Sequence, residues 1–474
     1  MNRRLIFYAL FLLFAPSIGA QQTAFVGVTV VDVRNGKLHN NQTVCIKDGI
    51  ISYVGPKKKL PKDTKVINAQ GKYMMPGLWD MHVHTTSENS PATEWPLLIA
   101  YGVTGVRDMG GHGPDLLLAS KTRLRNGAVG PRIYGAGKIL DGKPEVHTDQ
   151  KVNMATTQEA MAWVARMDSA GMDFIKGYEM LKPDVLEALA LACRQKGLKL
   201  AGHVPLTVTL TTAAKFMNSM EHLRGFDYAC SSLEDSIVTV QRQAIDTAQA
   251  NGAILRAKLL RSRFLSLYNS FDTAKALRLM RSLADNNVYQ CPTLSVGATP
   301  AVTRFDTTAS FVNAFQFLHD TTKKKWTSRF NSLLEAAKNP ANFSEMQLDY
   351  AFRKRMVKML AEQGVPLLAG TDLTLPMLIA GQSLHQELRL LAEAGLSPLQ
   401  VIQAATINPV KWLGLEKQAG TVARGKWADL LLLAKNPLEQ IANTETIEWV
   451  VANGKVYNRA ELDSLLRSIN GNRN

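Results

Sequence analysis

Short apolar runs alternate with stretches of helical periodicity through the middle of the chain. Eight of these runs, rich in apolar and β-branched residues, predict strands; they are residues 73–83, 103–109, 132–139, 174–178, 198–204, 219–223, 288–294 and 365–371. Helical spacing separates them, for example over residues 157–170 and 182–196. Strands that alternate with helices indicate β/α units and a parallel sheet. Eight such units predict an α/β fold of the (β/α)8 TIM-barrel type.

Both ends of the chain have a different pattern, of alternating apolar residues broken by tight turns. Asp48-Gly49 near the start and Asn453-Gly454 near the end each lie between two such runs, which predicts hairpins. Two β segments at opposite ends can share one domain if the chain between them returns to its starting point. We therefore expect residues 21–71 and 416–474 to form one small composite β-sandwich domain, and residues 72–415 to form the barrel.

The longest spacer of the barrel lies between its seventh and eighth predicted strands. Residues 300–362 are rich in helix formers and in aromatic residues such as Trp326 and Phe330. This composition predicts a helical insertion, to which the helical stretch 235–286 could contribute. The aromatic residues fit either a lid over the barrel mouth or simple packing of one helix on another.

The first twenty residues have the order of regions typical of a secretory signal peptide. Arg3 and Arg4 precede an apolar run over residues 5–14, and small residues follow up to Ala20. Ten apolar residues are too few to span a bilayer. We expect residues 1–20 to be removed and the protein to be exported, to the periplasm or beyond. An uncleaved N-terminal anchor is the alternative.

Composition and charge are those of a globular protein without a nucleic-acid footprint. Of the 474 residues, 46% are hydrophobic and 20% charged, and the formal net charge is +15. Only Lys57-Lys-Lys59 and Lys323-Lys-Lys325 form basic runs, so binding to nucleic acid is not expected. The positive charge is compatible with acidic substrates.

Cysteine does not supply a metal site in this sequence. The four cysteines are Cys45, Cys193, Cys230 and Cys291, and none of them forms a Cys-x-x-Cys motif. A thiolate zinc site is therefore not supported. Export permits disulfides, but the spacing selects no pairing, and buried free thiols fit the apolar surroundings better.

The candidate chemistry lies where the predicted strands end. His82 and His84 are two residues apart on a strand, so they share a face and could be half of a metal site or a coincidence. Four further polar residues end the fourth, fifth, sixth and eighth strands; they are Lys176, His203, His222 and Asp372. Because chemistry in such barrels sits at the carboxyl ends of the strands, we expect all six side chains to meet there.

The sequence resembles the amidohydrolase superfamily, and is most similar to its imidazolonepropionase-like and prolidase-like (Xaa-Pro dipeptidase type) branch. The resemblance covers nearly the whole chain after the signal peptide. It is carried by Gly71-Lys-Tyr-Met-Met-Pro-Gly-Leu-Trp-Asp-Met-His-Val-His, Gly102-Val-Thr-Gly-Val-Arg-Asp-Met-Gly, Leu384-His-Gln-Glu-Leu, Ala404-Ala-Thr-Ile-Asn-Pro and Gly425-Lys-Trp-Ala-Asp-Leu. The last segment is similar to the family's return into a composite β domain.

The resemblance implies a role for each candidate ligand. His82 and His84 match the ligands of the more buried metal, and His203 and His222 those of the second. Two Zn²⁺ ions, bridged by a carboxylated lysine, are therefore expected. An ammonium cannot ligate a cation, whereas a lysine carbamate offers two anionic oxygens, and burial favours the neutral amine from which it forms.

Lys176 matches the lysine that becomes carboxylated, and Asp372 matches the catalytic aspartate, which also binds metal. The implied reaction is hydrolysis of a C–N bond by a hydroxide that bridges the two metals. Asp372 then acts as general base and afterwards as general acid.

The expected substrate is a small molecule such as a dipeptide or an N-acyl amino acid. Tyr178 and Tyr228 follow Lys176 and His222 by two and six residues, and His147 lies in the loop after the third predicted strand. All three are candidates for substrate contacts, although packing is the favoured role of the two tyrosines. A cyclic amidase of the imidazolone or hydantoin type would use the same site. The alternative of another class is a catalytically silent binding protein on this fold. The oligomeric state stays open, with a homo-oligomer as one option.

Overall fold

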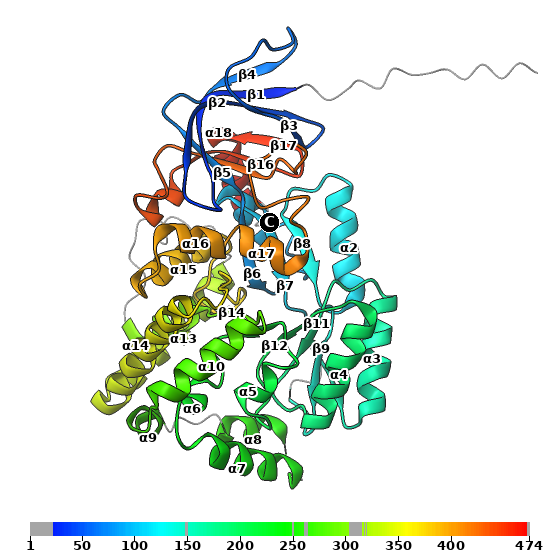
Figure 1. Ribbon diagram of the computed structural model, residues 1–474, viewed down its shortest axis with the longest axis vertical. Helices are drawn as coiled ribbons and strands as arrows, with labels where there is room; N and C mark the ends of the chain where they lie inside the picture. The colour runs from blue at the N-terminus through cyan, green and yellow to red at the C-terminus, as the bar shows by residue number, and fades with distance from the viewer. Residues whose placement is uncertain are drawn as a thin grey trace, which may run out of the picture.

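The architecture was analysed in a computed structural model of the chain, drawn in Figure 1. The structure describes residues 22–146, 150–248, 251–259, 264–302, 315, 316, 318 and 320–471. The predicted signal peptide and His147 lie outside these residues. Within them, no helix combines the length and the apolar character needed to cross a membrane.

One eight-stranded sheet joins the two ends of the chain. Its strands are β1(Thr23–Val31), β2(Leu38–Lys47), β3(Ile50–Gly55), β4(Lys65–Asn68), β5(Tyr73–Pro76), β15(Leu430–Leu433), β16(Ile447–Ala452) and β17(Lys455–Asn458). The order is β17-β16-β15-β5-β1-β2-β3, with β4 paired to β1. β5 is parallel to β1 and antiparallel to β15, so this strand connects the N-terminal and C-terminal parts. In Figure 1 the sheet forms the upper part of the molecule.

The joint sheet has its own hydrophobic core. Phe25, Ile51, Met74, Leu430 and Leu432 are buried together in it. Alternating residues of β15 point to opposite faces, which is why Leu431 and Leu433 belong instead to the main core. The predicted pairing of the two chain ends is thus present as one continuous sheet, not as two separate sheets of a sandwich. The domain boundaries at residues 71 and 416 stay predictions.

The remaining strands are parallel and divide into two sheets. β6(Leu78–Val83), β7(Val103–Asp108) and β8(Arg132–Gly135) form a three-stranded sheet. The second sheet has the order β10-β9-β11-β12-β13-β14; its strands are β9(Ile139–Gly142), β10(Lys151–Met154), β11(Ile175–Gly177), β12(Leu200–Gly202), β13(Ser219–Glu221) and β14(Tyr289–Cys291). The paired strands of both sheets run parallel, as the alternation with helices predicted.

Three of the eight predicted strands differ from the structure. The first is divided at Gly77, where an added Cβ would collide with the Thr104 side chain, so β5 enters the joint sheet and β6 the parallel one. The third is divided into β8 and β9 around Gly137, whose φ is 71°. The eighth is no ladder strand. The isolated bridges Gln290↔Leu367 and Val83↔Leu373 connect it to β14 and β6. Single backbone hydrogen bonds, such as that from Met81 N to the Ala369 carbonyl oxygen, add to this connection. A closed ring of strands is therefore not found within the described residues.

Helices cover the parallel strands on the outside (Figure 1). They are α1(Glu94–Ala100), α2(Pro114–Arg125), α3(Thr157–Ser169), α4(Pro183–Lys196), α5(Leu210–Ala213), α6(Phe226–Ala229), α7(Glu234–Asp246), α8(Gly252–Leu259), α9(Phe264–Asn269), α10(Thr273–Asp285), α11(Leu294–Val302), α13(Asp320–Ala337), α14(Pro340–Glu362), α15(Gln382–Glu393), α16(Pro398–Ala404), α17(Ile407–Leu413) and α18(Arg459–Gly471), with a 3-10 turn, η1(Ile441–Glu445).

The two helices singled out in the sequence begin and end by recognisable local rules. α3 begins with a capping box, in which Thr156 and Glu159 satisfy each other's backbone N–H groups. α4 has Pro183 in its first turn and ends at Gly197 in the left-handed conformation. The predicted helical insertion is described as α11, α13 and α14, apart from the residues between α11 and α13 that lie outside the description.

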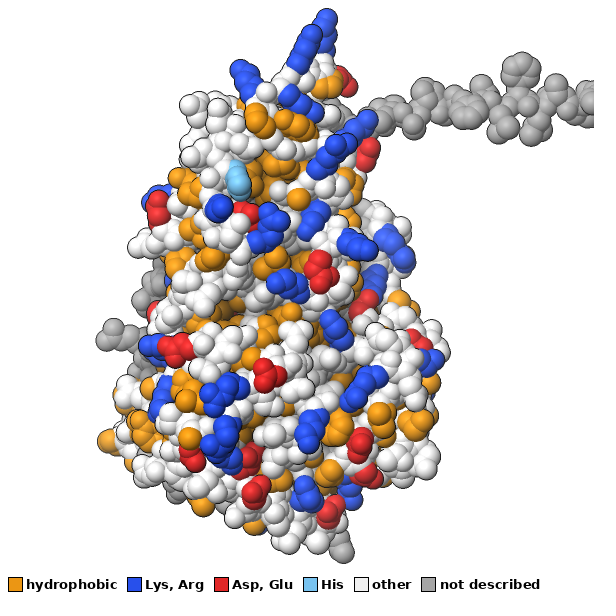
Figure 2. Space-filling model, viewed as in Figure 1, with side chains coloured by type: hydrophobic (Ala, Val, Ile, Leu, Met, Phe, Trp, Pro, Cys, Tyr) orange, Lys and Arg blue, Asp and Glu red, His pale blue; other side chains and the backbone are white. Residues whose placement is uncertain are grey.

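All four cysteines are buried and free in the structure, which agrees with the reading from sequence. Lys and Arg side chains are spread over the face shown in Figure 2 and lie among acidic ones, without a continuous basic track. The excess positive charge is therefore distributed on this face, which gives no support to a nucleic-acid surface.

Candidate active site

The first two candidate ligands stand at the end of β6. His82 is completely buried, and the side chain of His84, just past the strand, is 23% exposed. His82 Nδ1 donates a hydrogen bond to Glu221 Oε2 at 2.8 Å, and His84 Nδ1 donates to the Gly110 carbonyl oxygen at 2.6 Å. Carboxylate and carbonyl oxygens only accept, so the proton lies on Nδ1 and Nε2 keeps its lone pair.

The other two histidines are held in the same way. His203 follows β12, and its Nδ1 is 2.7 Å from Glu179 Oε1. His222 follows β13, and its Nδ1 is 2.7 Å from Thr293 Oγ1. All four imidazoles thus have Nδ1 engaged by an oxygen, which directs Nε2 to the interior of the site. Outer partners of this kind orient the histidines of protein metal sites.

The six residues predicted from strand ends are brought together. The ring centroid of His222 lies 4.5 Å from that of His82 and 4.7 Å from that of His203. Lys176 Nζ, on β11, is 3.4 Å from His82 Nε2. Asp372 Oδ1 is 3.3 Å from His82 Nε2 and 3.5 Å from His84 Nε2. The short strands therefore converge on one point although they do not form a complete ladder.

Burial gives these groups the protonation states that metal binding needs. Desolvation lowers the pKa of His203 to about 4, and lowers those of His82 and His222 well below the usual histidine range. The imidazoles are therefore neutral near pH 7. Desolvation also lowers the pKa of Lys176 to about 8, although the nearby carboxylates of Asp372 and Glu221 oppose that shift. At pH 7 about a tenth of the Lys176 amine is therefore uncharged.

Backbone conformation directs two of the ligands. His222 and Asp372 both have φ of 64°, a left-handed conformation that residues other than glycine adopt rarely. Asp372 N donates to the His82 carbonyl oxygen at 2.8 Å. Asp80 accepts hydrogen bonds from the Thr371 backbone N–H at 3.0 Å and from its hydroxyl at 2.7 Å. The turn that presents Asp372 is thus fixed from β6, and strained residues of this kind are concentrated at functional sites.

A buried ion pair behind His82 was not predicted from the sequence. Arg107 Nη2 donates to both oxygens of Glu221, at 2.8 and 2.9 Å, and Ser219 Oγ donates to Oε1 at 2.6 Å. Arg107 and Glu221 lie within apolar strands, and charges there must be paired. The sequence thus indicates that each of these two charges has a partner, but it does not indicate which residue the partner is.

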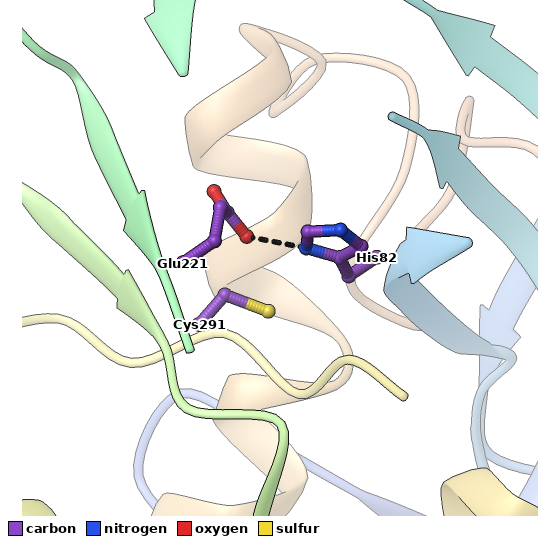
Figure 3. Close-up of side chains that lie close together, drawn as sticks. All are labelled: His82, Glu221 and Cys291. Carbon is purple, nitrogen blue, oxygen red and sulfur yellow. Dashed lines mark hydrogen bonds and ion pairs between the residues drawn. The ribbon is translucent and has the colours of Figure 1, made fainter. Parts of the chain in front are cut away.

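Figure 3 shows Glu221 and Cys291 beside His82, on the Nδ1 side of the ring. Both oxygens of Glu221 already accept hydrogen bonds, and burial raises the pKa of the Cys291 thiol well above its usual value. Cys291 is therefore a neutral thiol. Glu221 therefore orients His82, and these three side chains do not form a second metal site.

A second buried carboxylate orients His203. Glu179 accepts from His203 Nδ1, and Arg256 of α8 donates to it through Nη2 at 3.1 Å. Arg224 Nη2 lies 3.4 Å from Glu179 Oε1. These partners, chiefly Arg224 and His203, hold the pKa of Glu179 well below the usual range despite its burial. The stretch 235–286, expected only as additional helix, thus contributes Arg256, which binds the carboxylate that orients His203.

The three predicted substrate contacts have different outcomes. The ring of Tyr178 packs on His203 with centroids 4.1 Å apart, and Lys151 Nζ lies 3.4 Å from its centroid. Tyr228 is buried and lines a cavity of about 420 Å³. His147 lies outside the described residues. Contact of any of the three with substrate stays a prediction.

The donor set fits a divalent transition metal. One ligand atom each from His82, His84 and Asp372 lies within 4.8 Å of the others. Neutral imidazole nitrogens and a carboxylate are the ligands that Zn²⁺ and its neighbours prefer. His203, His222 and Lys176 provide a further set next to His82, as the ring contacts and the 3.4 Å from Lys176 Nζ to His82 Nε2 show.

Comparison with known proteins agrees with this chemistry. Residues 73–457 match the family described as the amidohydrolase family. The chain belongs to this family. Amidohydrolases of this kind are metal-dependent hydrolases that act on carbon–nitrogen bonds, and the chain is an enzyme of that class.

Curated relatives are distant but extend over most of the chain. An imidazolonepropionase from Vibrio cholerae serotype O1 is 23% identical over 429 residues, which cover 84% of this chain and 88% of the relative. An adenine deaminase from Ruegeria sp. (strain TM1040) is 23% identical over 437 residues, or 90% of this chain. The aligned part is only 56% of the deaminase's length.

Solved structures of other amidohydrolases have a similar fold. A bottromycin amidohydrolase superposes with a TM-score of 0.72 at 24% identity, covering 95% of this chain and 90% of that one. A putative prolidase from Bifidobacterium longum gives 0.63 at 22% identity, covering 95% and 100%. These likenesses support a TIM-barrel-type fold with an additional domain, as the resemblance in sequence implied.

Proposed function

We propose that this amidohydrolase hydrolyses the amide bond of dipeptides or N-acyl amino acids, using two Zn²⁺ ions bridged by carboxylated Lys176. The observation that carries the proposal is the convergence of four histidines, a buried lysine and Asp372 on one point. Carboxylated Lys176, whose Nζ lies 3.4 Å from His82 Nε2, would supply the anionic bridge between the two metals.

Lys176 is suited to carboxylation by its surroundings. Its amine is completely buried, with a pKa of about 8, so the neutral form, which has the free electron pair that attacks CO₂, is accessible near pH 7. The amine nitrogen forms the new N–C bond, one proton leaves, and the ammonium is replaced by an anionic carbamate with two oxygens. An anion at this position balances the charge of the metals that His82 and its neighbours hold.

The protein residues then have defined roles in hydrolysis. When bound, the two ions supply Lewis acidity, which lowers the pKa of a water molecule to near 7 and polarises the scissile carbonyl. Asp372, held by the turn at φ of 64°, accepts the proton from the nucleophile and donates it to the leaving amine. Glu221 and Glu179 keep His82 and His203 in the ligating tautomer.

The second candidate is a cyclic amidase of the imidazolone or hydantoin type. The imidazolonepropionase relatives motivate it, whereas the prolidase-like structures motivate the first choice. Both reactions use the same metals and the same Asp372, and differ only in whether the leaving amine stays attached to the product. A silent binding protein is not supported, because all six site positions hold residues that can ligate or transfer a proton.

A substrate screen with metal analysis tests the proposal. Purified protein should contain about two Zn per chain by mass spectrometry, and should release free amino acid from some member of a panel of dipeptides and N-acyl amino acids. Turnover of hydantoins or imidazolones with no cleavage of the linear panel would reverse the choice between the two candidates. Absence of bound metal, even after incubation with Zn²⁺ and bicarbonate, would contradict the binuclear mechanism.

We also propose that the protein works outside the cytoplasm, after removal of residues 1–20. The support is the order of basic, apolar and small residues in that segment.

A further inference from the structure

A buried ion pair lies at the edge of the second parallel sheet, and the proposed mechanism does not use it. The side chains of Lys151 on β10 and Asp141 on β9 are 2% and 0% exposed, and Lys151 Nζ lies 3.4 Å from Asp141 Oδ2. Burying two charges together contributes little net stability, because each must first lose its water. The pair is therefore better explained by the geometry that it imposes on its neighbours.

The strand register brings this ion pair to the face of the sheet that carries Lys176. Lys151 and Lys176 both stand opposite Ile139 of β9, one on each side of that strand. Residues in register on parallel strands point to the same face, and so do residues two apart on one strand. Asp141, two residues after Ile139, therefore points to that face as well, and the pair lies on the same side of the sheet as the candidate site.

Lys151 contacts the ring of Tyr178, and this ring packs on His203. Lys151 Nζ lies 3.4 Å from the ring centroid of Tyr178, a distance at which a cation is attracted to the face of an aromatic ring. The centroid of the same ring lies 4.1 Å from that of the His203 imidazole, with 30° between the two planes. A buried ammonium on a strand thus limits the positions that the ring and the imidazole can take.

Asp141 fixes the backbone next to Glu179. Its Oδ1 accepts hydrogen bonds from Met180 N at 2.7 Å and from Gly142 N at 2.9 Å. The two segments are in close contact, since a Cβ at Gly142 would lie 1.8 Å from the Met180 carbonyl oxygen. Glu179 directly precedes Met180, so its main chain is anchored to β9, and its carboxylate holds His203 Nδ1 at 2.7 Å.

Both contacts of the ion pair act on the same candidate ligand, His203. His82 and His84 are held from other elements, by Glu221 of β13 and by the carbonyl oxygen of Gly110 after β7. The ion pair should therefore affect one half of the candidate metal site more than the other.

We propose that the Lys151–Asp141 pair is a positioning device for His203, and that it raises the affinity of the metal ion that His203 binds. The pair holds the ring and the carboxylate that contact this histidine, so the imidazole Nε2 is directed to the metal position before a metal arrives. The ion that His82 and His84 bind is not affected. This inference rests on the two-metal site of the proposed function, and adds two positioning residues to it.

A double-mutant cycle tests the positioning role. Lys151→Met removes the ammonium and keeps the length of the side chain. In otherwise unchanged protein it should weaken the binding of one of the two zinc ions about tenfold, measured by competition with a chelator. In protein that carries His203→Gln it should change zinc affinity less than about twofold, because the ligand through which it acts is gone. Equal losses in both backgrounds would indicate a structural role and overturn the proposal.

Lys121→Met is the matched control. Lys121 also pairs with an aspartate, Asp173, at 2.7 Å, and this aspartate also accepts a backbone N–H, that of Gly135, at 2.7 Å. Because that pair lies outside the site, zinc affinity should change less than about twofold.

A second variant guards against an effect of the unpaired charge alone. Lys151→Met leaves Asp141 as a buried anion without its cation, whereas Lys151→Met combined with Asp141→Asn leaves no buried charge unpaired. The combined variant should still weaken the same zinc ion at least about threefold, because the Tyr178 ring has lost its cation. If the combined variant binds zinc as the wild type does, the proposal is overturned.

Nuclear magnetic resonance of metal-free protein separates this proposal from the proposed function. With isotope-labelled histidine, the Nδ1–H of His203, identified by its loss in His203→Gln, should give one signal, which Lys151→Met broadens or splits and Lys121→Met does not. If wild-type protein binds no zinc but this change is found, the two-metal mechanism fails and the positioning of His203 stands. If wild-type protein binds two zinc ions but the signal does not respond to Lys151→Met, the metal site stands and the positioning role is wrong.

Discussion

At the scale of single residues, the geometry of the site depends on the hydrogen-bond partner of each histidine. Each of the four histidines of the site has its Nδ1 bound to an oxygen that comes from another part of the chain, such as Glu221 for His82 and Glu179 for His203. These oxygens fix the tautomer and the ring direction before a metal arrives. The two carboxylates are held in turn by Arg107 and Arg256. Metal affinity therefore depends on residues that never touch a metal.

Replacement of Lys176 by alanine tests the bridge. Without the carbamate the two metals repel each other, so zinc content should fall from about two to one or less per chain, and kcat/KM should fall by at least about 100-fold. A short carboxylate such as propionate, which can enter the space left by the side chain, should restore part of the activity. Lys121→Ala, which removes an amine outside the site, is the control. Unchanged occupancy and rate in Lys176→Ala would show that the bridging role is wrong.

Replacement of Glu221 by glutamine tests the support of His82. The amide leaves Arg107 as a buried cation without its anion, which should lower the free energy of unfolding by about 3–5 kcal/mol. Zinc affinity should fall about 10- to 100-fold because His82 loses its charged acceptor. Urea unfolding and competition with a chelator measure the two effects. Glu448→Gln, which breaks the part-exposed pair with Lys72, should cost less than about 1 kcal/mol.

At the scale of elements, short strands and tight turns position the ligands. β11, β12 and β13 have three residues each, and the ligand lies within or directly after the strand. Because parallel strands place their carboxyl ends together, three residues of pairing are sufficient to bring Lys176, His203 and His222 to one point. The division at Gly77 has a second function, since it transfers the chain from the joint sheet to β6 and so to His82.

Gly77→Ala tests that transfer. A Cβ at this position would overlap the side chain of Thr104, which is buried on β7, so neither side can move without disturbing the strands. We expect a loss of about 1–3 kcal/mol in the free energy of unfolding, with lower zinc retention. Gly297→Ala is the matched control, because its nearest contact is 3.4 Å away and helix α11 favours alanine. An equal effect of the two substitutions would contradict this account of Gly77.

At the scale of the whole molecule, the two ends of the chain enclose one core. β15 pairs with β5, and Leu430 and Leu432 pack with Phe25 and Ile51, so the N-terminal strands depend on a segment that is synthesised last. The helices after β13 contribute differently: they surround the cavity that adjoins His222 and hold Glu179 through Arg256. The joint sheet thus connects the two chain ends, and the helices support the candidate site from outside.

Truncation tests the role of the C-terminal segment. Removal of residues 416–474 would expose the edge of β5 and the apolar side chains that face Leu430 and Leu432, so we expect insoluble protein or loss of cooperative unfolding. Removal of residues 472–474 alone should leave soluble yield and zinc content unchanged. A soluble, metal-binding truncated chain would show that the joint sheet is dispensable.

The proposed export is tested by the charge of the N-terminal segment. Arg3→Glu combined with Arg4→Glu should retain the protein in the cytoplasm at its full length, because the basic start of a signal peptide directs its insertion. Mass spectrometry of wild-type protein from the exported fraction should give a mature chain that begins near residue 21. Glu substitutions at Lys57 and Lys58 change the net charge equally and should not affect export.

The sequence by itself determined the α/β class, the pairing of the two chain ends and the six residues that meet at the site. These follow from local rules: hydrophobic period distinguishes strands from helices, and the carboxyl ends of parallel strands lie together. Tertiary structure alone decided which buried charges pair, because Arg107 and Glu221 are 114 residues apart. It also decided where the strands divide, through close contacts such as that of Gly77 with Thr104. Tertiary structure alone also decided the cavity beside His222, because no local pattern relates Tyr228 to Gln241 and Arg353 before the helices pack together.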